Sequence, residues 1–271
     1  MRYRPELDIT PSLDPDQASY YMSLIGILRW AVELGQIDIY IDIALLSSFM
    51  VQPRIGHKME VLHIFSYLKA HENSKLVFDP MPQAWDEGKF QSFDWSDFYR
   101  DAKEPIPPNA PLPRGNPVQI NAFKDADHAG NRITRRSHTG ILIYANSAPI
   151  IWFSKAQTTV ETSTLGSEFI AMKIAVELLE ALRYRLRMFG IPIDGASNVF
   201  YDNKSVVSNS TVPESMLKKK HNAIAYHRVR ESVASGALRI AYVQSKSNNA
   251  DLLTKPLPGP ELRAMVSNIL W

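Results

Sequence analysis

The hydrophobic residues at the start of the chain repeat with a helical period. Helices are predicted, in chain order, over residues 15–35, 37–50 and 56–71. Asp14 or Asp16 can cap the first of these helices. A short strand is predicted over 76–78, but no strand-rich pattern separates the helices. Residues 1–78 are therefore expected to form a small, mainly helical unit.

The pattern is lost over residues 79–116, where prolines and scattered acidic residues leave no sustained period. Closely spaced prolines mark turns and extended chain, so this stretch is predicted to be a Pro-rich linker or a surface loop. Its aromatic residues indicate that part of it packs on a neighbouring element.

From residue 117 the pattern becomes that of an α/β domain, which is expected to cover 117–271. Strands are predicted over about 118–125, 138–146, 149–155, 197–202 and 238–245. Helices are predicted over about 163–189, directly after Asp202, over 221–234, and from about Asn248. The first three strands follow one another directly, as in an antiparallel meander, so the expected order is β-β-β-α-β-α-α-β-α.

Composition narrows the class of protein. The 271 residues are 45% hydrophobic and 21% charged, which is typical of a globular protein. The absence of cysteine excludes disulfide scaffolds, thiolate zinc sites and cysteine nucleophiles. Charged residues interrupt the longest apolar region, and the first residues lack an apolar signal segment. We therefore expect no membrane partner and an intracellular location.

The charge is unevenly distributed although the formal net charge is only +2. Residues 1–116 carry a net charge of −5, and residues 117–271 carry +7. A basic half of this kind suggests a polyanion partner. The densest basic run is expected to contact nucleic-acid phosphates, although a solvated helix start would look similar, and it contains Lys218, Lys219, Lys220, Arg228 and Arg230.

Four acidic residues stand at predicted strand ends or helix starts, where α/β folds collect reactive groups: Asp125, Glu168, Asp202 and Asp251. Convergent carboxylates without cysteine favour Mg²⁺ or Mn²⁺, and two such ions suit phosphodiester hydrolysis. Glu168 heads an apolar helical stripe, so its charge needs compensation by a divalent cation or by a buried arginine.

Several motifs in a fixed order resemble the ribonuclease H domain of copia-type LTR retrotransposons. They are Lys124-Asp-Ala-Asp-His-Ala-Gly130, Arg135-Arg-Ser-His-Thr-Gly140, Ile151-Trp-Phe-Ser-Lys155, Glu161-Thr-Ser-Thr-Leu-Gly-Ser-Glu-Phe-Ile-Ala171, Tyr201-Asp-Asn203, Lys220-His221 with Tyr226-His227, and Ala250-Asp-Leu-Leu-Thr-Lys-Pro256. Segments within residues 21–69 resemble the thumb and connection elements that follow the polymerase palm in the same polyproteins. The chain thus looks like the C-terminal part of a copia-type Pol polyprotein.

This resemblance implies an RNase H-like fold, a mixed five-stranded sheet flanked by helices. It implies that Asp125 and Asp202 bind or bridge both ions, that Glu168 holds the leaving-group-side ion and that Asp251 holds the nucleophile-side ion. The implied reaction is cleavage of the RNA strand of an RNA–DNA hybrid, which leaves 5′-phosphate and 3′-hydroxyl ends. The polymerase portion of the same polyprotein is the implied partner, in a cytoplasmic virus-like particle or in the nucleus.

Alternatives remain at this stage. Asp127 lies on the same strand face as Asp125 and could be the first ligand instead. His128, His221 and His227 could assist proton transfer, but each is more often structural. The order Asp–Glu–Asp–Asp disfavours a transposase or integrase, which would order its acids Asp–Asp–Glu. No Y-x-D-D signature is present, so polymerase activity is not expected. An inactive retroelement remnant that binds nucleic acid without cleaving it is the alternative function.

Overall fold

The computed structural model describes residues 3–217, 220–267 and 269–270. Its helices are α1 (Pro15–Glu33), α2 (Tyr40–Ser47), α3 (Ile55–Ala70), α4 (Thr164–Met188), α5 (Lys204–Thr211), α6 (Ala223–Ala234) and α7 (Gly259–Val266). Its strands are β1 (Ile120–Asp127), β2 (His138–Ala145), β3 (Ala148–Ala156), β4 (Ser197–Tyr201) and β5 (Leu238–Tyr242). The predicted element order is confirmed, apart from the differences described below.

The N-terminal helices form where the periodic pattern predicts them. The Asp14 carboxylate accepts a hydrogen bond from the Gln17 amide at 2.8 Å, and Pro15 occupies the first helical position of α1. Helices α1, α2 and α3 share a hydrophobic cluster that includes Tyr21 and Ile25, neither of which is exposed to solvent. The predicted helix over 37–50 is shorter, because a 3-10 turn at Ile37–Ile39 precedes α2.

The sheet has the strand order β3-β2-β1-β4-β5. Strands β1, β2 and β3 form the predicted antiparallel meander, and β4 and β5 run parallel to β1. The mixed five-stranded sheet implied by the sequence motifs is therefore confirmed. Because β1 and β4 are parallel neighbours, with Phe123 beside Phe200, the residues that follow them meet at the same edge.

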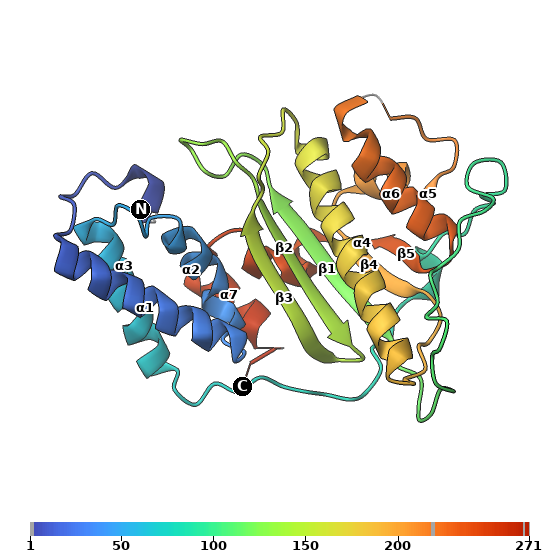
Figure 1. Ribbon diagram of the computed structural model, residues 1–271, viewed down its shortest axis with the longest axis horizontal. Coiled ribbons are helices and arrows are strands. Elements are labelled where there is room, and N and C mark those ends of the chain that lie inside the picture. Colours follow the sequence, from blue (N-terminus) through green and yellow to red (C-terminus); the bar gives the residue numbers. More distant parts are fainter. Residues whose placement is uncertain (1–2, 218–219, 268, 271) are drawn as a thin grey trace.

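Helices cover both faces of the sheet (Figure 1). Helices α4 and α6 pack on one face, where Ile120 and Ala122 of β1 join their hydrophobic cluster. Phe123 points to the opposite face, toward α7 and a 3-10 turn at Asn249–Leu253. The N-terminal helices lie on this second side, where the Trp152 indole of β3 donates to the Val32 carbonyl at 2.9 Å.

The predicted strand over 76–78 is wrong, because Leu76 forms only an isolated bridge with Leu270. The segment that follows has little regular structure, but it packs on the sheet as its aromatic residues predicted. The Trp85 indole donates to Asn121 at 3.1 Å, and its ring centroid lies 4.1 Å from that of Phe200. Residues 79–116, here called the strap, therefore pack in part on the sheet face opposite α4.

The end of the chain also differs from the prediction. The strand predicted over 238–245 ends at Tyr242, and α7 was not predicted. Helix α7 packs against the 3-10 turn at Asn249–Leu253, which replaces the predicted last helix. None of the helices in the described part of the chain is long and apolar enough to cross a membrane.

Candidate active site

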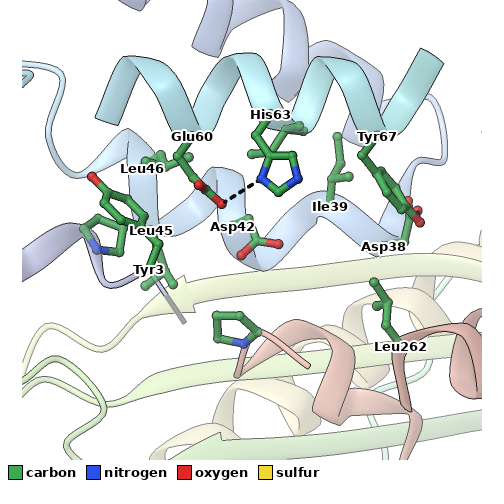
Figure 2. Close-up of a pocket in the computed structure, with 13 residues that line it drawn as sticks. Tyr3, Asp38, Ile39, Asp42, Leu45, Leu46, Glu60, His63, Tyr67 and Leu262 are labelled. Carbon is green, nitrogen blue, oxygen red and sulfur yellow. Dashed lines mark hydrogen bonds and ion pairs between the residues drawn. The ribbon is translucent and has the colours of Figure 1, made fainter. Parts of the chain in front are cut away.

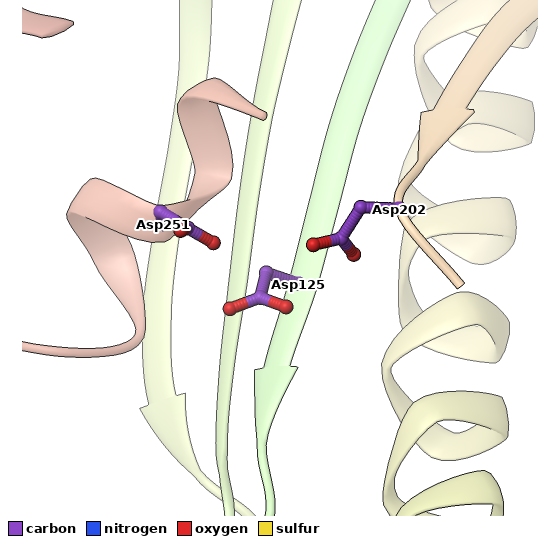
Figure 3. A group of neighbouring side chains, drawn as sticks. All are labelled: Asp125, Asp202 and Asp251. Atoms are coloured by element: carbon purple, nitrogen blue, oxygen red, sulfur yellow. The ribbon is translucent and has the colours of Figure 1, made fainter. Parts of the chain in front are cut away.

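Three of the four predicted acids converge at the sheet edge (Figure 3). Asp125 lies in β1, Asp202 directly follows β4, and Asp251 lies in the 3-10 turn that packs on β1 and β2. One carboxylate oxygen from each residue lies within 4.8 Å of the others. In the described part of the chain, this is the one group of three or more Asp, Glu or His side chains that converges so closely.

Neighbouring side chains orient this cluster. The Thr254 hydroxyl donates to the Asp125 Oδ2 at 2.5 Å, and the Lys255 Nζ lies 2.7 Å from the Asp251 Oδ2. The Asp251 Oδ1 is buried and accepts no hydrogen bond within the described chain. A buried carboxylate oxygen without a partner is costly unless a cation compensates it, so this atom has the environment expected of a metal ligand.

The electrostatic environment of Asp251 also indicates a cation site. Burial, and then the nearby charge of Asp125, raise the pKa of Asp251 to about 7. Carboxylates this close repel one another, and a divalent cation bound between them would reverse the effect. Mg²⁺ and Mn²⁺ take oxygen ligands of this kind, so the donor set of the three aspartates fits such an ion.

Glu168 lies outside this cluster, although it is buried in the first turns of α4. The Lys124 Nζ lies 3.0 Å from the Glu168 Oε2 and 3.0 Å from its backbone oxygen. The sequence had suggested a divalent cation or a buried arginine as the compensating charge, and the structure supplies a buried lysine. Burial raises the pKa of Glu168 to about 7, and the charges of Asp125 and Asp202 add to this rise, so Glu168 is close to the cluster without joining it.

Lys124 is a buried residue beside the candidate site that the sequence prediction did not single out. Its position in β1 carries the signal, because it alternates with Ile120 and Ala122, whose side chains pack against α4. A lysine at an inward-facing position needs a buried partner. Burial lowers the pKa of the Lys124 amine, whereas the Glu168 carboxylate acts in the opposite direction.

The Asp127 carboxylate contacts the neighbouring strand β2 and does not join the cluster. It accepts a hydrogen bond from the His138 backbone amide of β2, and burial raises its pKa to about 6. The structure therefore brings Asp125, and not Asp127, to the other two aspartates. His128 and His227 are exposed, and His227 Nδ1 lies 2.6 Å from the Tyr99 hydroxyl. The side chain of His221 lies outside the described part of the structure.

The predicted phosphate-binding run does not form a continuous basic surface among the described residues. Lys218 and Lys219 lie outside the described residues, and Lys220 is exposed in a 3-10 turn before α6. Arg228 forms an ion pair with Glu180. Only Lys220 of the described members is left facing solvent without such a partner.

Arg230 is a correction to the sequence prediction. It is only 2% exposed, and its guanidinium donates to the carbonyls of Asn209 at 2.9 Å and Val212 at 2.8 Å. It donates to the Pro213 carbonyl as well. A guanidinium committed to backbone carbonyls supports the loop after α5 and cannot reach a phosphate.

A different set of basic residues borders the aspartate cluster. A groove of about 1010 Å³ runs beside Asp251 and is lined by Lys89, Lys246, Lys255 and the Trp85 ring, among others. Lys89 and Lys246 are exposed and lie far apart in the sequence, so no local pattern could have grouped them. The groove places three lysines and an aromatic ring next to the carboxylates, and its wall also carries Glu261.

A second hollow, of about 460 Å³, lies between α2, α3 and the segment that leads to α7 (Figure 2). Its wall carries Asp38, Asp42 and Glu60, and the Glu60 Oε1 lies 3.7 Å from the His63 Nδ1. These acids do not converge as the three aspartates do. The three aspartates at the sheet edge are therefore the stronger candidate for a metal site.

Comparisons with known proteins show which sequences and structures the chain resembles. The chain is 26% identical over 265 residues to the retrovirus-related Pol polyprotein from transposon RE1 of Arabidopsis thaliana. The aligned region covers 98% of this chain and 16% of the polyprotein. It is 33% identical over 146 residues to the retrovirus-related Pol polyprotein from transposon RE2 of the same plant. The aligned region covers 54% of this chain and 10% of that protein. No family model matches the chain.

Among solved structures, LC11-RNase H1 in complex with an RNA/DNA hybrid matches with a TM-score of 0.40 and 17% identity, over 50% of this chain and 94% of that chain. The mixed sheet in the order β3-β2-β1-β4-β5, with its flanking helices, defines a mixed α/β protein. Its relatives are retrovirus-related Pol polyproteins of copia-type transposons, which confirms the resemblance drawn from the motifs. The chain spans less than a fifth of the length of these two relatives.

Proposed function

We propose that this chain is a metal-dependent ribonuclease H, which cleaves the RNA strand of RNA–DNA hybrids to leave 5′-phosphate and 3′-hydroxyl ends. The observation that carries the proposal is the convergence of Asp125, Asp202 and Asp251 within 4.8 Å at the end of the sheet. These residues would hold Mg²⁺ or Mn²⁺. When bound, such an ion supplies activation of water and stabilisation of the charge that develops on the phosphate.

Two residues of the chain hold the proposed metal ligands in place. The Thr254 hydroxyl donates to the Asp125 carboxylate, and Lys255 pairs with one oxygen of Asp251, so that among the described residues the other, buried oxygen has no hydrogen-bond partner. Ligands that are oriented in advance by hydrogen bonds bind metal more tightly and react faster. These contacts support hydrolysis at this position.

The groove beside Asp251 is the proposed path of the nucleic-acid backbone. Lys89 and Lys246 would contact phosphates, since such contacts supply most non-specific affinity. Lys220 and the neighbouring lysines remain candidates for further phosphate contacts. A hybrid would be recognised by its shape and its 2′-hydroxyls rather than by base sequence.

The chain is proposed to act within a longer Pol polyprotein, with the polymerase portion as its partner. The RE1 relative extends far beyond the matched region, which supports this context. In this arrangement residues 1–78 form a thumb- and connection-like unit, and residues 117–271 form the nuclease domain. Residues 79–116 form the Pro-rich linker between them. We expect the protein to act inside the cell, in a cytoplasmic particle or in the nucleus.

One observation favours a second function. Glu168, predicted as the fourth metal ligand, is paired with Lys124. If this pair abolished catalysis, the chain would bind nucleic acid without cleaving it. Incubation with Mg²⁺ and end-labelled RNA–DNA hybrid, double-stranded RNA and double-stranded DNA distinguishes the two functions. The nuclease cuts only the RNA of the hybrid and leaves 3′-hydroxyl ends, whereas hybrid binding without any product would refute the proposed activity.

A further inference from the structure

The Lys124 amine is enclosed on all sides at the edge of the aspartate cluster. Its side chain has no solvent exposure. Two of its contacts are the Glu168 carboxylate and backbone oxygens, each 3.0 Å away. The third is the Tyr201 ring, whose centroid lies 3.1 Å from Nζ. An ammonium has three donors, and here each of them has a partner.

The amine also lies close to the acids of the cluster. Strand β1 places Lys124 next to Asp125, and Tyr201 directly precedes Asp202. The Tyr201 ring that contacts the amine therefore belongs to the residue next to a second aspartate of the cluster. Lys124 therefore places a positive group against Glu168, near the ends of the strands β1 and β4 where two of the three aspartates lie.

An ion that used the Glu168 Oε2 as a ligand would have to displace this amine, and an ion at Oε1 would lie beside its positive charge. Among the described residues, the only carboxylate within ion-pair distance of Lys124 Nζ is that of Glu168. Displacement would leave a fully buried ammonium without its ion pair, and breaking one partner from a buried pair is strongly unfavourable. The three aspartates, by contrast, can bind an ion without breaking the Lys124–Glu168 pair.

We infer that Lys124 takes the place of the second cation, so that the chain binds one divalent ion at Asp125, Asp202 and Asp251. This inference concerns the same site as the proposed nuclease function and rests on it. Lys124 is a positioning residue here, because it holds Glu168 and contributes a positive charge without contacting substrate. The two-ion site implied by the sequence motifs would form only when Lys124 is removed.

Counting bound Mn²⁺ on the full 271-residue chain tests this inference. Electron paramagnetic resonance of free Mn²⁺ gives the number of ions bound per chain, and circular dichroism checks that each variant is folded. We expect one Mn²⁺ on the wild-type chain and two on Lys124→Met, which frees Glu168. The double variant Lys124→Met/Glu168→Gln should return to one ion, because it removes the added ligand together with the lysine.

Two Mn²⁺ on the wild-type chain, or one on a folded Lys124→Met chain, would overturn the inference. The wild-type count decides even if the single variant does not fold. Hybrid cleavage is measured separately on the same samples. One bound ion without any cleavage would refute the nuclease function alone, whereas cleavage with two bound ions would refute only the role of Lys124.

Discussion

The substitution Glu104→Ala removes the ion pairs that hold the strap, residues 79–116, against helix α4. The Glu104 carboxylate accepts hydrogen bonds from Arg183 Nε at 2.6 Å and Arg183 Nη2 at 2.9 Å. It also accepts one from Arg187 Nη2 at 2.9 Å. The Arg183 side chain is only 3% exposed, so loss of Glu104 would leave most of its charge without an ion-pair partner.

The two guanidinium groups lower the pKa of Glu104 from 4.5 to about 2, against the opposing effect of burial. A difference of this size corresponds to at most about 3 kcal/mol of stability at neutral pH. Solvent at the edge of the site screens part of the interaction, so we expect a loss of about 2 kcal/mol.

The pH dependence gives the sign of the effect. A carboxyl group whose pKa is lowered by folding stabilises the fold above its unfolded pKa, and this contribution is lost as the pH falls through the folded value. The difference between wild type and Glu104→Ala should therefore be complete above about pH 5. It should shrink between pH 4.5 and about 2.

Urea unfolding followed by tryptophan fluorescence measures this difference at neutral and acidic pH. Glu177→Ala is the matched control, because Glu177 lies on the same helix and forms an exposed i,i+4 ion pair with Lys173. Such a pair contributes only about 0.3–0.5 kcal/mol. Equal losses for the two variants, or a Glu104 effect that persists unchanged at pH 2, would refute the reasoning.

Two further predictions concern buried polar groups. Thr254→Val keeps the side-chain shape but removes the hydroxyl that orients Asp125, so hybrid cleavage should fall about tenfold or more while the melting temperature changes little; unchanged cleavage would contradict the role of that hydrogen bond. His138 has a pKa lowered by burial to about 4, so the unfolded chain takes up its proton first as the pH falls below 6.5. The stability advantage of wild type over His138→Gln should therefore narrow by about 3 kcal/mol between pH 7 and pH 4, and urea unfolding that shows a constant difference would argue against a neutral buried histidine.

Local patterns predicted most of the fold. The helical period gave the three N-terminal helices, and the alternation over 118–125 gave β1, because both signals depend on neighbours in the sequence. The strand predicted over 76–78 did not form, since a short apolar run needs a strand beside it and Leu76 finds only Leu270. Helix α7 was missed because it is a short helix among prolines.

The candidate site was only partly predictable. Asp125 and Asp202 were identified by their positions at strand ends, Asp251 by its position at a helix start, and all three by motifs; the topology brings them together. The role of Lys124 depends on which face of β1 lies against α4, which is a tertiary property. Similarly, Arg230 looked like part of a basic run until the fold showed that its partners are backbone carbonyls.

The groove beside Asp251 also could not be predicted from the sequence. Lys89 comes from the strap, whereas Lys246 and Lys255 come from the last part of the chain. They meet beside Asp251 because Trp85 and Phe90 of the strap pack on the sheet face opposite α4. Charge counts along the sequence cannot detect such a surface, since they average over residues that the fold later separates or joins.

The most direct measurement is cleavage of a labelled RNA–DNA hybrid by wild type and Asp202→Asn, with Mg²⁺ and with EDTA. Asp194→Asn is the control, because Asp194 is exposed and lies outside the cluster. Wild type and Asp194→Asn should cut the RNA strand only with Mg²⁺, and Asp202→Asn should lose at least about a hundredfold in rate while it remains folded. Cleavage that survives EDTA, or an Asp202→Asn chain that cuts at the wild-type rate, would contradict a metal-dependent nuclease built on these three aspartates.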